Sequence, residues 1–188
     1  FLTHLKRWAA GLGLNEVINY SFVGHNDLNL LNLPAEGRIS IKNPLSAEQD
    51  VLRTELGPGL LNTLRHNLAQ GAGQGASGIR VFELARSFTA CAEAETGALE
   101  QGRLAIMLYG ARHDGYWPQI EADVDYQDIK GLVEQLLRFL HLPPAQYKLV
   151  STHNWLLPCV EVLLEGKPLG LIGRVDPEIA DACHARKP

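Results

Sequence analysis

The segment Asn43–Leu68, NPLSAEQDVLRTELGPGLLNTLRHNL, carries the strongest local structural signals in the chain. Its first two residues, Asn43-Pro44, end the preceding extended run, because proline lacks a backbone donor and disfavours helix at the residue before it. Ser46 and Gln49 have the spacing of a capping box, in which two side chains satisfy backbone donors at the start of a helix. The pattern therefore predicts a short helix from this point to about Leu56.

A second helix is predicted in the other half of the segment. Gly57-Pro58 interrupts the chain, and proline is favoured at the first position of a helix. Leucines then recur on one helical face, and Gly71 ends the helix. These leucines are Leu60, Leu61, Leu64 and Leu68. From the pattern alone, the segment is a helix-turn-helix corner of a globular core.

The residue identities in this segment add a family resemblance. The segment fits the pattern N-P-L-S-x-E-x-x-x-L-R-x-x-L-x-P-G-L-L-x-x-L-x-x-N, which includes Asn43, Pro44, Arg53, Pro58 and Gly59. It resembles a signature segment of the beta subunit of bacterial phenylalanyl-tRNA synthetase, in the domain that is similar to a class II synthetase catalytic core. The resemblance covers nearly all of the 188 residues, strongly in the middle and weakly at the end.

Length and composition describe an ordinary globular protein. The chain has 188 residues, of which 46% are hydrophobic and 20% charged, enough for one domain with a sizeable core. The net charge of -4 argues against general attraction to nucleic acid, which requires clustered Lys and Arg. No apolar run approaches the roughly 20 residues that span a bilayer, so a membrane protein is not expected. Cys91, Cys159 and Cys183 lack C-x-x-C spacing, and their odd number favours a reducing, cytoplasmic location.

The first 23 residues predict a helix followed by a strand. Apolar residues recur at helical spacing at Leu5, Trp8 and Leu12, and Glu16–Val23 is β-branched and aromatic, as in a strand covered on both faces. A helix leading into such a strand resembles motif 1 of class II synthetases, which in that family builds subunit contacts. Leu5, Trp8 and Leu12 are therefore candidate interface residues, although a helix packed on its own sheet explains the pattern equally well.

The segment from 79 to 88, IRVFELARSF, predicts a strand and is the second stretch with the resemblance. The beta subunit has F-E-L-G-R here, and in class II synthetases the matching strand holds an arginine and a glutamate that grip ATP and substrate. Glu83 and Arg86 match the glutamate and the arginine of F-E-L-G-R, with Ala85 in place of the glycine. Side-chain alternation puts Arg80 and Arg86 on the face opposite Glu83. We therefore expect Glu83 to be a buried or interfacial hydrogen-bonding residue, rather than an ATP ligand, because a buried carboxylate requires a partner.

Two motifs are given structural interpretations. Gly73–Gly78 matches G-x-G-x-x-G but follows a helix and precedes a strand, the reverse of the dinucleotide-binding order, so a flexible connector is predicted. Tyr116 and Trp117 could stack on bases of single-stranded RNA. Arg112 is the only basic residue close to them in the sequence, so packing within the protein is favoured over RNA binding.

The second half of the chain predicts a strand over 103–110, a helix over 125–140 and a final hairpin. Asp125 is placed to cap the helix, whose leucines form a wide apolar stripe. Asp128, Lys130 and Gly131 are in register with the beta-subunit pattern, and Lys130 is expected to be solvated. Strands are predicted at 146–150, 160–165 and 168–175, and a last helix begins after Asp176. Where the family commonly has H-P-G-R-S-A, residues 153–159 read HNWLLPC, so the arginine and glycine are missing.

No site chemistry of its own is predicted for this chain. It has no H-E-x-x-H, no paired Cys/His spacing and no G-x-S-x-G, so neither a metal site nor nucleophilic catalysis is expected. The resemblance implies an α+β fold with a mainly antiparallel sheet flanked by helices, a class II synthetase-like core truncated at its C-terminal end. It also implies a single domain over 1–188, a fragment of a longer multidomain chain.

Two functions are considered. The resemblance implies a non-catalytic core that docks the alpha subunit in an (αβ)2 heterotetramer, where ATP and Mg²⁺ serve attachment of phenylalanine to tRNA(Phe), with no cofactor in this fragment. In that assembly tRNA is bound by the whole complex. The alternative is a regulatory module with a class II-like fold that still binds ATP or an amino acid.

Overall fold

The computed structural model describes residues 1–46, 48–73, 78–113 and 122–185. The chain folds into two compact units. The first comprises Phe1–Asn67 and Arg80–Met107, and the second comprises Leu68–Ile79 and Leu108–Pro188.

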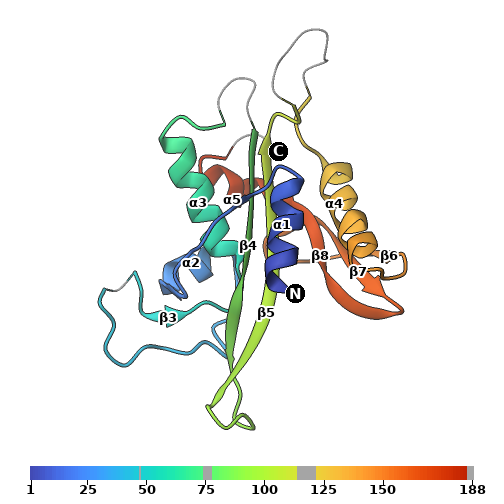
Figure 1. The fold of residues 1–188 in the computed structure, drawn as a ribbon. Helices are drawn as coiled ribbons and strands as arrows, with labels where there is room; N and C mark the ends of the chain where they lie inside the picture. Colours follow the sequence, from blue (N-terminus) through green and yellow to red (C-terminus); the bar gives the residue numbers. More distant parts are fainter. Residues whose placement is uncertain (47, 74–77, 114–121, 186–188) are drawn as a thin grey trace. The chain divides into compact units, whose positions relative to one another are not determined.

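In the first unit, helix α1 (Leu2–Gly11) precedes a sheet of three strands in the order β1-β4-β5. Helix α1 packs against β1 (Asn15–Glu16) and buries Leu5 and Ala9. Strands β4 (Gly78–Ala90) and β5 (Ala98–Gly110) are long neighbours joined by a short turn, as Figure 1 shows, which makes them antiparallel. β1 pairs with β4 in parallel. The predicted N-terminal helix and both central strands are confirmed.

The predicted strand over 16–23 is wrong in its continuity and in its burial. The structure has β1, then an extended stretch outside any strand, then β2 (Phe22–Val23), which pairs antiparallel with β3 (Val51–Leu52). Residues at even positions from Ile18 to Phe22 are exposed, whereas Val17, Asn19 and Ser21 are half-buried and Val23 is buried. The segment therefore has one covered face and one open face.

The predicted short helix between Ser46 and Leu56 is also wrong. The amide of Gln49 donates to the carbonyl of Ser46 at 3.1 Å, which closes a turn, and Val51–Leu52 is a strand. On its other side this strand bonds residues 39–41, which form an isolated bridge between Ser40 and Val51. Backbone partners on both sides thus outweigh the local helix signal, a common tertiary effect. Ala47 lies outside the described residues.

The second helix predicted within Asn43–Leu68 is confirmed as α3 (Gly57–Ala69). It buries Pro58, Gly59 and three of the predicted leucines. A short helix, α2 (His25–Leu30), follows β2.

The second unit contains helix α4 (Tyr126–Phe139), an antiparallel sheet in the order β6-β7-β8, and helix α5 (Pro177–Ala182). The strands are β6 (Gln146–Val150), β7 (Leu156–Leu164) and β8 (Lys167–Val175), and α4 packs against β8 (Figure 1). The predicted helix and hairpin are confirmed, although β7 begins four residues earlier than expected. The fold class is α+β with mainly antiparallel sheets, as predicted. Within the described ranges, no helix combines the length and apolarity that a bilayer crossing requires.

Candidate functional site

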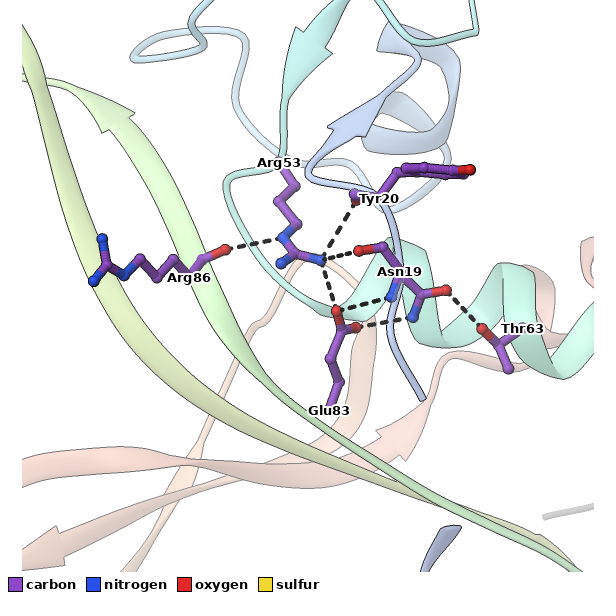
Figure 2. Close-up of polar contacts among 6 residues, drawn as sticks. All are labelled: Asn19, Tyr20, Arg53, Thr63, Glu83 and Arg86. Atoms are coloured by element: carbon purple, nitrogen blue, oxygen red, sulfur yellow. Dashed lines mark hydrogen bonds and ion pairs between the residues drawn. The ribbon is translucent and has the colours of Figure 1, made fainter. Parts of the chain in front are cut away.

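An ion pair between Arg53 and Glu83 lies in the interior of the first unit. Arg53 follows β3, and Glu83 lies in the middle of β4. Arg53 Nη1 is 2.7 Å from Glu83 Oε1, and the two side chains are only 5% and 2% exposed. Figure 2 shows the two side chains meeting from opposite directions. The partner that Glu83 requires is therefore Arg53, and neither Arg80 nor Arg86.

The Arg53–Glu83 pair holds the extended stretch around Asn19. Glu83 Oε1 accepts from the backbone amide of Asn19 at 3.2 Å, and Oε2 accepts from Asn19 Nδ2 at 2.9 Å. Arg53 Nη1 donates to the carbonyls of Asn19 and Tyr20 at 3.3 and 3.4 Å (Figure 2). Arg53 Nε donates to the carbonyl of Arg86 at 2.9 Å. Two buried side chains thus connect β4, the end of β3 and the stretch between β1 and β2.

These contacts explain why the predicted strand is interrupted. The pairing of β1 with β4 continues to Val17, whose amide donates to the carbonyl of Phe82 at 2.9 Å. Beyond Ser21, whose carbonyl accepts from the amide of Arg53 at 2.9 Å, the chain enters the β2–β3 ladder. Between these two points, backbone groups of residues 19 and 20 bond to the pair. Buried backbone groups require partners, and here side chains supply them.

Asn19 also connects the pair to helix α3. Its Oδ1 accepts from Thr63 Oγ1 at 2.8 Å, and a Cβ added at Gly59 would lie 3.0 Å from Asn19 Cβ. The signature residues Arg53, Gly59 and Glu83 therefore meet around a residue that the sequence analysis missed. A polar Asn inside the apolar run VINYSFV was the available signal.

Gly59→Ala is expected to destabilise the chain by about 1–3 kcal/mol, the usual cost of overpacking a filled site. The new methyl would displace Asn19 and disturb its bonds to Glu83 and Thr63. Urea unfolding of the 188-residue chain measures the change. Gly131→Ala is the control, since a Cβ there meets nothing within 4 Å. Equal or greater stability of Gly59→Ala would contradict the close contact with Asn19.

The pair does not fit a role in gripping a nucleotide. Both oxygens of Glu83 accept bonds from protein groups, and Arg53 Nε and Nη1 donate to protein acceptors. The Arg86 guanidinium is on the surface, 2.6 Å from Glu100 Oε2 and 71% exposed. For a metal ion, no group of three or more His, Cys, Asp and Glu side chains with suitable placement is found among the described residues. The chemistry available here is structural: a charged pair that fixes the backbone.

The remaining signature and interface residues are dispersed. Asn43 and Pro44 are exposed in the loop before β3, and Pro58 is buried in the first turn of α3. On α1, Leu5 is 6% exposed and Trp8 is half-buried, and Leu12, which directly follows the helix, is also half-buried. Their assignment to a subunit interface stays a prediction. Residues 74–77 of the glycine-rich connector, and Tyr116 and Trp117, lie outside the described residues.

A second polar cluster fixes the start of α4 in the second unit. Arg112 bonds Asp125 Oδ2 at 2.7 Å and Asp128 Oδ2 at 3.0 Å, and Asp128 Oδ2 accepts from the amide of Asp125 at 2.7 Å. These contacts raise the pKa of the Arg112 guanidinium. Lys130 is less solvated than expected, since its Nζ lies 5.0 Å from the centroid of the Tyr147 ring and 3.5 Å from Glu134 Oε1. The signature residues here support the helix, and Gly131 has open space around it.

The stabilising effect of Asp125 is expected to be lost in acid. The amide of Gln127 donates to the Asp125 carboxylate and, with Arg112, holds the pKa of that carboxyl below its usual value, while burial opposes the shift. A depressed pKa in the folded state stabilises the protein above the unfolded-state pKa, and this contribution disappears as the pH falls through the folded-state value. The difference in unfolding free energy between wild type and Asp125→Asn should therefore shrink below about pH 4. Urea unfolding from pH 7 to 3 measures it, and a constant difference would contradict the prediction.

The open face of the extended segment carries three large apolar side chains. Ile18 is 87% exposed, Tyr20 75% and Phe22 45%, and they alternate with the inward-facing residues that contact the pair and β3. Figure 2 shows the Tyr20 ring directed away from Arg53 and Glu83. We call Ile18, Tyr20 and Phe22 the apolar ridge. Exposed apolar surface of this kind is typical of an interaction site.

Comparison with known proteins identifies relatives over the whole chain. The family model described as "Phenylalanyl tRNA synthetase beta chain CLM domain" matches residues 1–188. A phenylalanine–tRNA ligase beta subunit from Nitratidesulfovibrio vulgaris is 59% identical over 187 residues, and one from Oleidesulfovibrio alaskensis is 58% identical. Both alignments cover 100% of this chain and 23% of the relative. The beta subunit from Vibrio cholerae is 34% identical over 89% of this chain and 21% of its own length.

A solved structure shares the fold at low sequence identity. A pyrrolysyl-tRNA synthetase, PylSc from Desulfitobacterium hafniense, matches with a TM-score of 0.66 and 15% identity, over 98% of this chain and 60% of that one. The fold is therefore similar to that of a class II synthetase. Together with the match of the family model over residues 1–188, these relatives show that the chain belongs to the phenylalanyl-tRNA synthetase beta chain CLM domain family.

Proposed function

We propose that this chain is a non-catalytic synthetase-like core that supports attachment of phenylalanine to tRNA(Phe) by docking the catalytic alpha subunit. The proposal begins from the family, whose members compared above are named beta subunits of phenylalanine–tRNA ligase. A beta subunit operates with a second kind of chain. The assembly proposed is an (αβ)2 heterotetramer, in which tRNA is bound by the whole complex.

The apolar ridge is the observation that supports docking most strongly. Ile18, Tyr20 and Phe22 present apolar side chains from a segment fixed on its inner face by buried polar contacts. A preformed apolar surface favours association, because little ordering remains to be paid on binding. Tyr20 adds an aromatic ring with a polar end, the side-chain type enriched at the centres of interfaces.

The Arg53–Glu83 pair supports the non-catalytic part of the proposal. Its polar atoms bond to each other and to the backbone, as described above, so the β4 glutamate is committed to the fold. ATP and Mg²⁺ are then used in the alpha subunit. Three free cysteines, Cys91, Cys159 and Cys183, agree with a reducing, cytoplasmic location for the assembly.

The positive test is capture of the chain by immobilised alpha subunit from the same organism. The proposal predicts that the full-length beta polypeptide is captured. Gel densitometry should then give a 1:1 ratio of the two chains. Bovine serum albumin immobilised at the same density is the control surface. Absence of capture under conditions where both chains are folded would overturn the proposal.

The alternative function, a regulatory module that binds ATP or an amino acid, is tested separately. Calorimetric titration of the 188-residue chain with ATP and with phenylalanine should give no binding heat if the pair is structural. Appreciable heat at micromolar affinity would favour the alternative.

A further inference from the structure

The stretch of chain that carries the apolar ridge, residues 17–22, is bonded through its backbone to the rest of the first unit at three places. At its start, the amide of Val17 bonds the carbonyl of Phe82, and at its end the carbonyl of Ser21 accepts from the amide of Arg53. In the middle, the amide of Asn19 and the carbonyls of Asn19 and Tyr20 bond the side chains of Glu83 and Arg53. Only the middle attachment depends on side-chain identity.

The middle attachment determines which way the ridge faces. Side chains alternate between two faces only where the backbone of each residue is extended. A change in the backbone dihedral angles of one residue would turn the side chains of the following residues to the opposite face. The chain leaves the β1–β4 ladder after Val17 and reaches β2 only at Phe22. Between these positions the pair, with Thr63 on Asn19 Oδ1, keeps Asn19 inward, and so keeps Ile18 and Tyr20 outward.

We propose that the buried Arg53–Glu83 pair is a positioning device for the apolar ridge: it keeps the stretch around Asn19 extended so that Ile18, Tyr20 and Phe22 present one preformed surface to the alpha subunit. The glutamate lies on the strand that resembles the ATP-gripping strand of class II enzymes. In this chain it acts on a protein backbone. This inference rests on the proposed function, because the ridge needs a partner to be positioned for.

Stability and positioning make different predictions when both members of the pair are replaced. Replacing a complete buried ion pair by apolar side chains of similar volume is often neutral for stability or even stabilising. Such a replacement nevertheless removes every side-chain bond to the backbone of residues 19 and 20. The double variant Arg53→Met/Glu83→Leu therefore separates the two roles.

The experiment measures the affinity of the full-length beta polypeptide for the alpha subunit, together with its melting temperature and its amide exchange. For Arg53→Met/Glu83→Leu, we expect a melting temperature near that of wild type. Affinity should be about tenfold weaker, since ridge side chains must then be ordered on binding. Amides of residues 18–21 should exchange faster in the free polypeptide, while those of α3 should not change.

Met107→Ala is the control for general destabilisation. Met107 is buried on β5, which β4 separates from β1, so a cavity there should lower the melting temperature and leave the affinity unchanged. If the double variant does not fold, the same measurements are made on Glu83→Gln. The side-chain amide nitrogen of the new glutamine cannot accept the hydrogen bond that Asn19 Nδ2 donates to Glu83 Oε2 in the wild type. The affinity of the Glu83→Gln polypeptide for the alpha subunit should also fall, while that of the Met107→Ala polypeptide should not.

An affinity of the pair variant within twofold of wild type, with unchanged exchange over residues 18–21, would overturn the positioning role. Weakening by Met107→Ala to the same extent would also overturn it, because the effect would then follow stability. Failure of wild type to bind the alpha subunit is a different result, which overturns the proposed function itself.

Discussion

Arg53→Met alone is expected to lower the free energy of unfolding of the 188-residue chain by about 3–5 kcal/mol, the usual cost of leaving one buried charge without its partner. Glu83 is buried in the folded state, and without Arg53 its carboxylate would keep only the bonds from Asn19. The carbonyl of Arg86 would also lose a donor from the interior. Urea unfolding followed by tryptophan fluorescence measures the loss.

Arg86→Met is the matched control for Arg53→Met. It removes the same kind of side chain from β4, but its ion pair with Glu100 is on the surface, with side chains 71% and 43% exposed. Exposed pairs contribute roughly 0–1 kcal/mol, so the control should change little. Equal effects of the two substitutions would contradict a buried, backbone-bonded role for Arg53.

Tyr20→Asp is expected to weaken the affinity of the full-length beta polypeptide for the alpha subunit by about 30-fold or more, as at interface positions that contribute about 2 kcal/mol or more. The substitution would place a charge at the middle of the apolar ridge. Stability should change by no more than about 0.5 kcal/mol, because the side chain is 75% exposed in this chain. Surface plasmon resonance and thermal unfolding provide the two measurements.

Leu169→Asp is the control for the ridge variant. Leu169 is an exposed apolar residue on β8, in the other unit, at 48% exposure. It should leave the affinity unchanged, since the ridge is proposed to be specific rather than one apolar patch among several. Weakening by both substitutions to the same extent would mean that the ridge is not the docking surface.

Strong local signals in the sequence predicted most helices and strands correctly. Asp125 accepts from the amides of Gln127 and Asp128, as its capping position required, and α4 follows. Strand β6 and the hairpin of β7 and β8 also follow their turn residues and apolar runs. In these places local preference and tertiary environment agree, so the pattern is sufficient.

The errors fall where long-range contacts decide the local structure. The capping-box spacing of Ser46 and Gln49 favoured a helix, but Val51 and Leu52 have backbone partners far away in the chain and become a strand. The run from Glu16 to Val23 was predicted to be one strand, yet Asn19 leaves the ladder to bond Glu83. Neither contact leaves a periodic trace in the sequence.

The sequence predicted several residues of the candidate site, but it did not predict how they are arranged around Asn19. Arg53, Gly59 and Glu83 were singled out because they fit the family pattern, and the burial of Glu83 was expected from its strand position. Their meeting at Asn19 required the chain to bring together residues separated by 30 to 64 positions. The ridge was missed for a related reason, since an apolar run looks the same whether its second face is covered or open.

Hydrogen–deuterium exchange of the full-length beta polypeptide, alone and with saturating alpha subunit, tests most directly whether this core is a docking scaffold. Binding is expected to slow amide exchange across residues 17–23, where the ridge lies, and the Arg53→Met/Glu83→Leu variant should show weaker slowing at equal alpha concentration. Unchanged exchange over residues 17–23 in a formed complex, with slowing elsewhere, would contradict it.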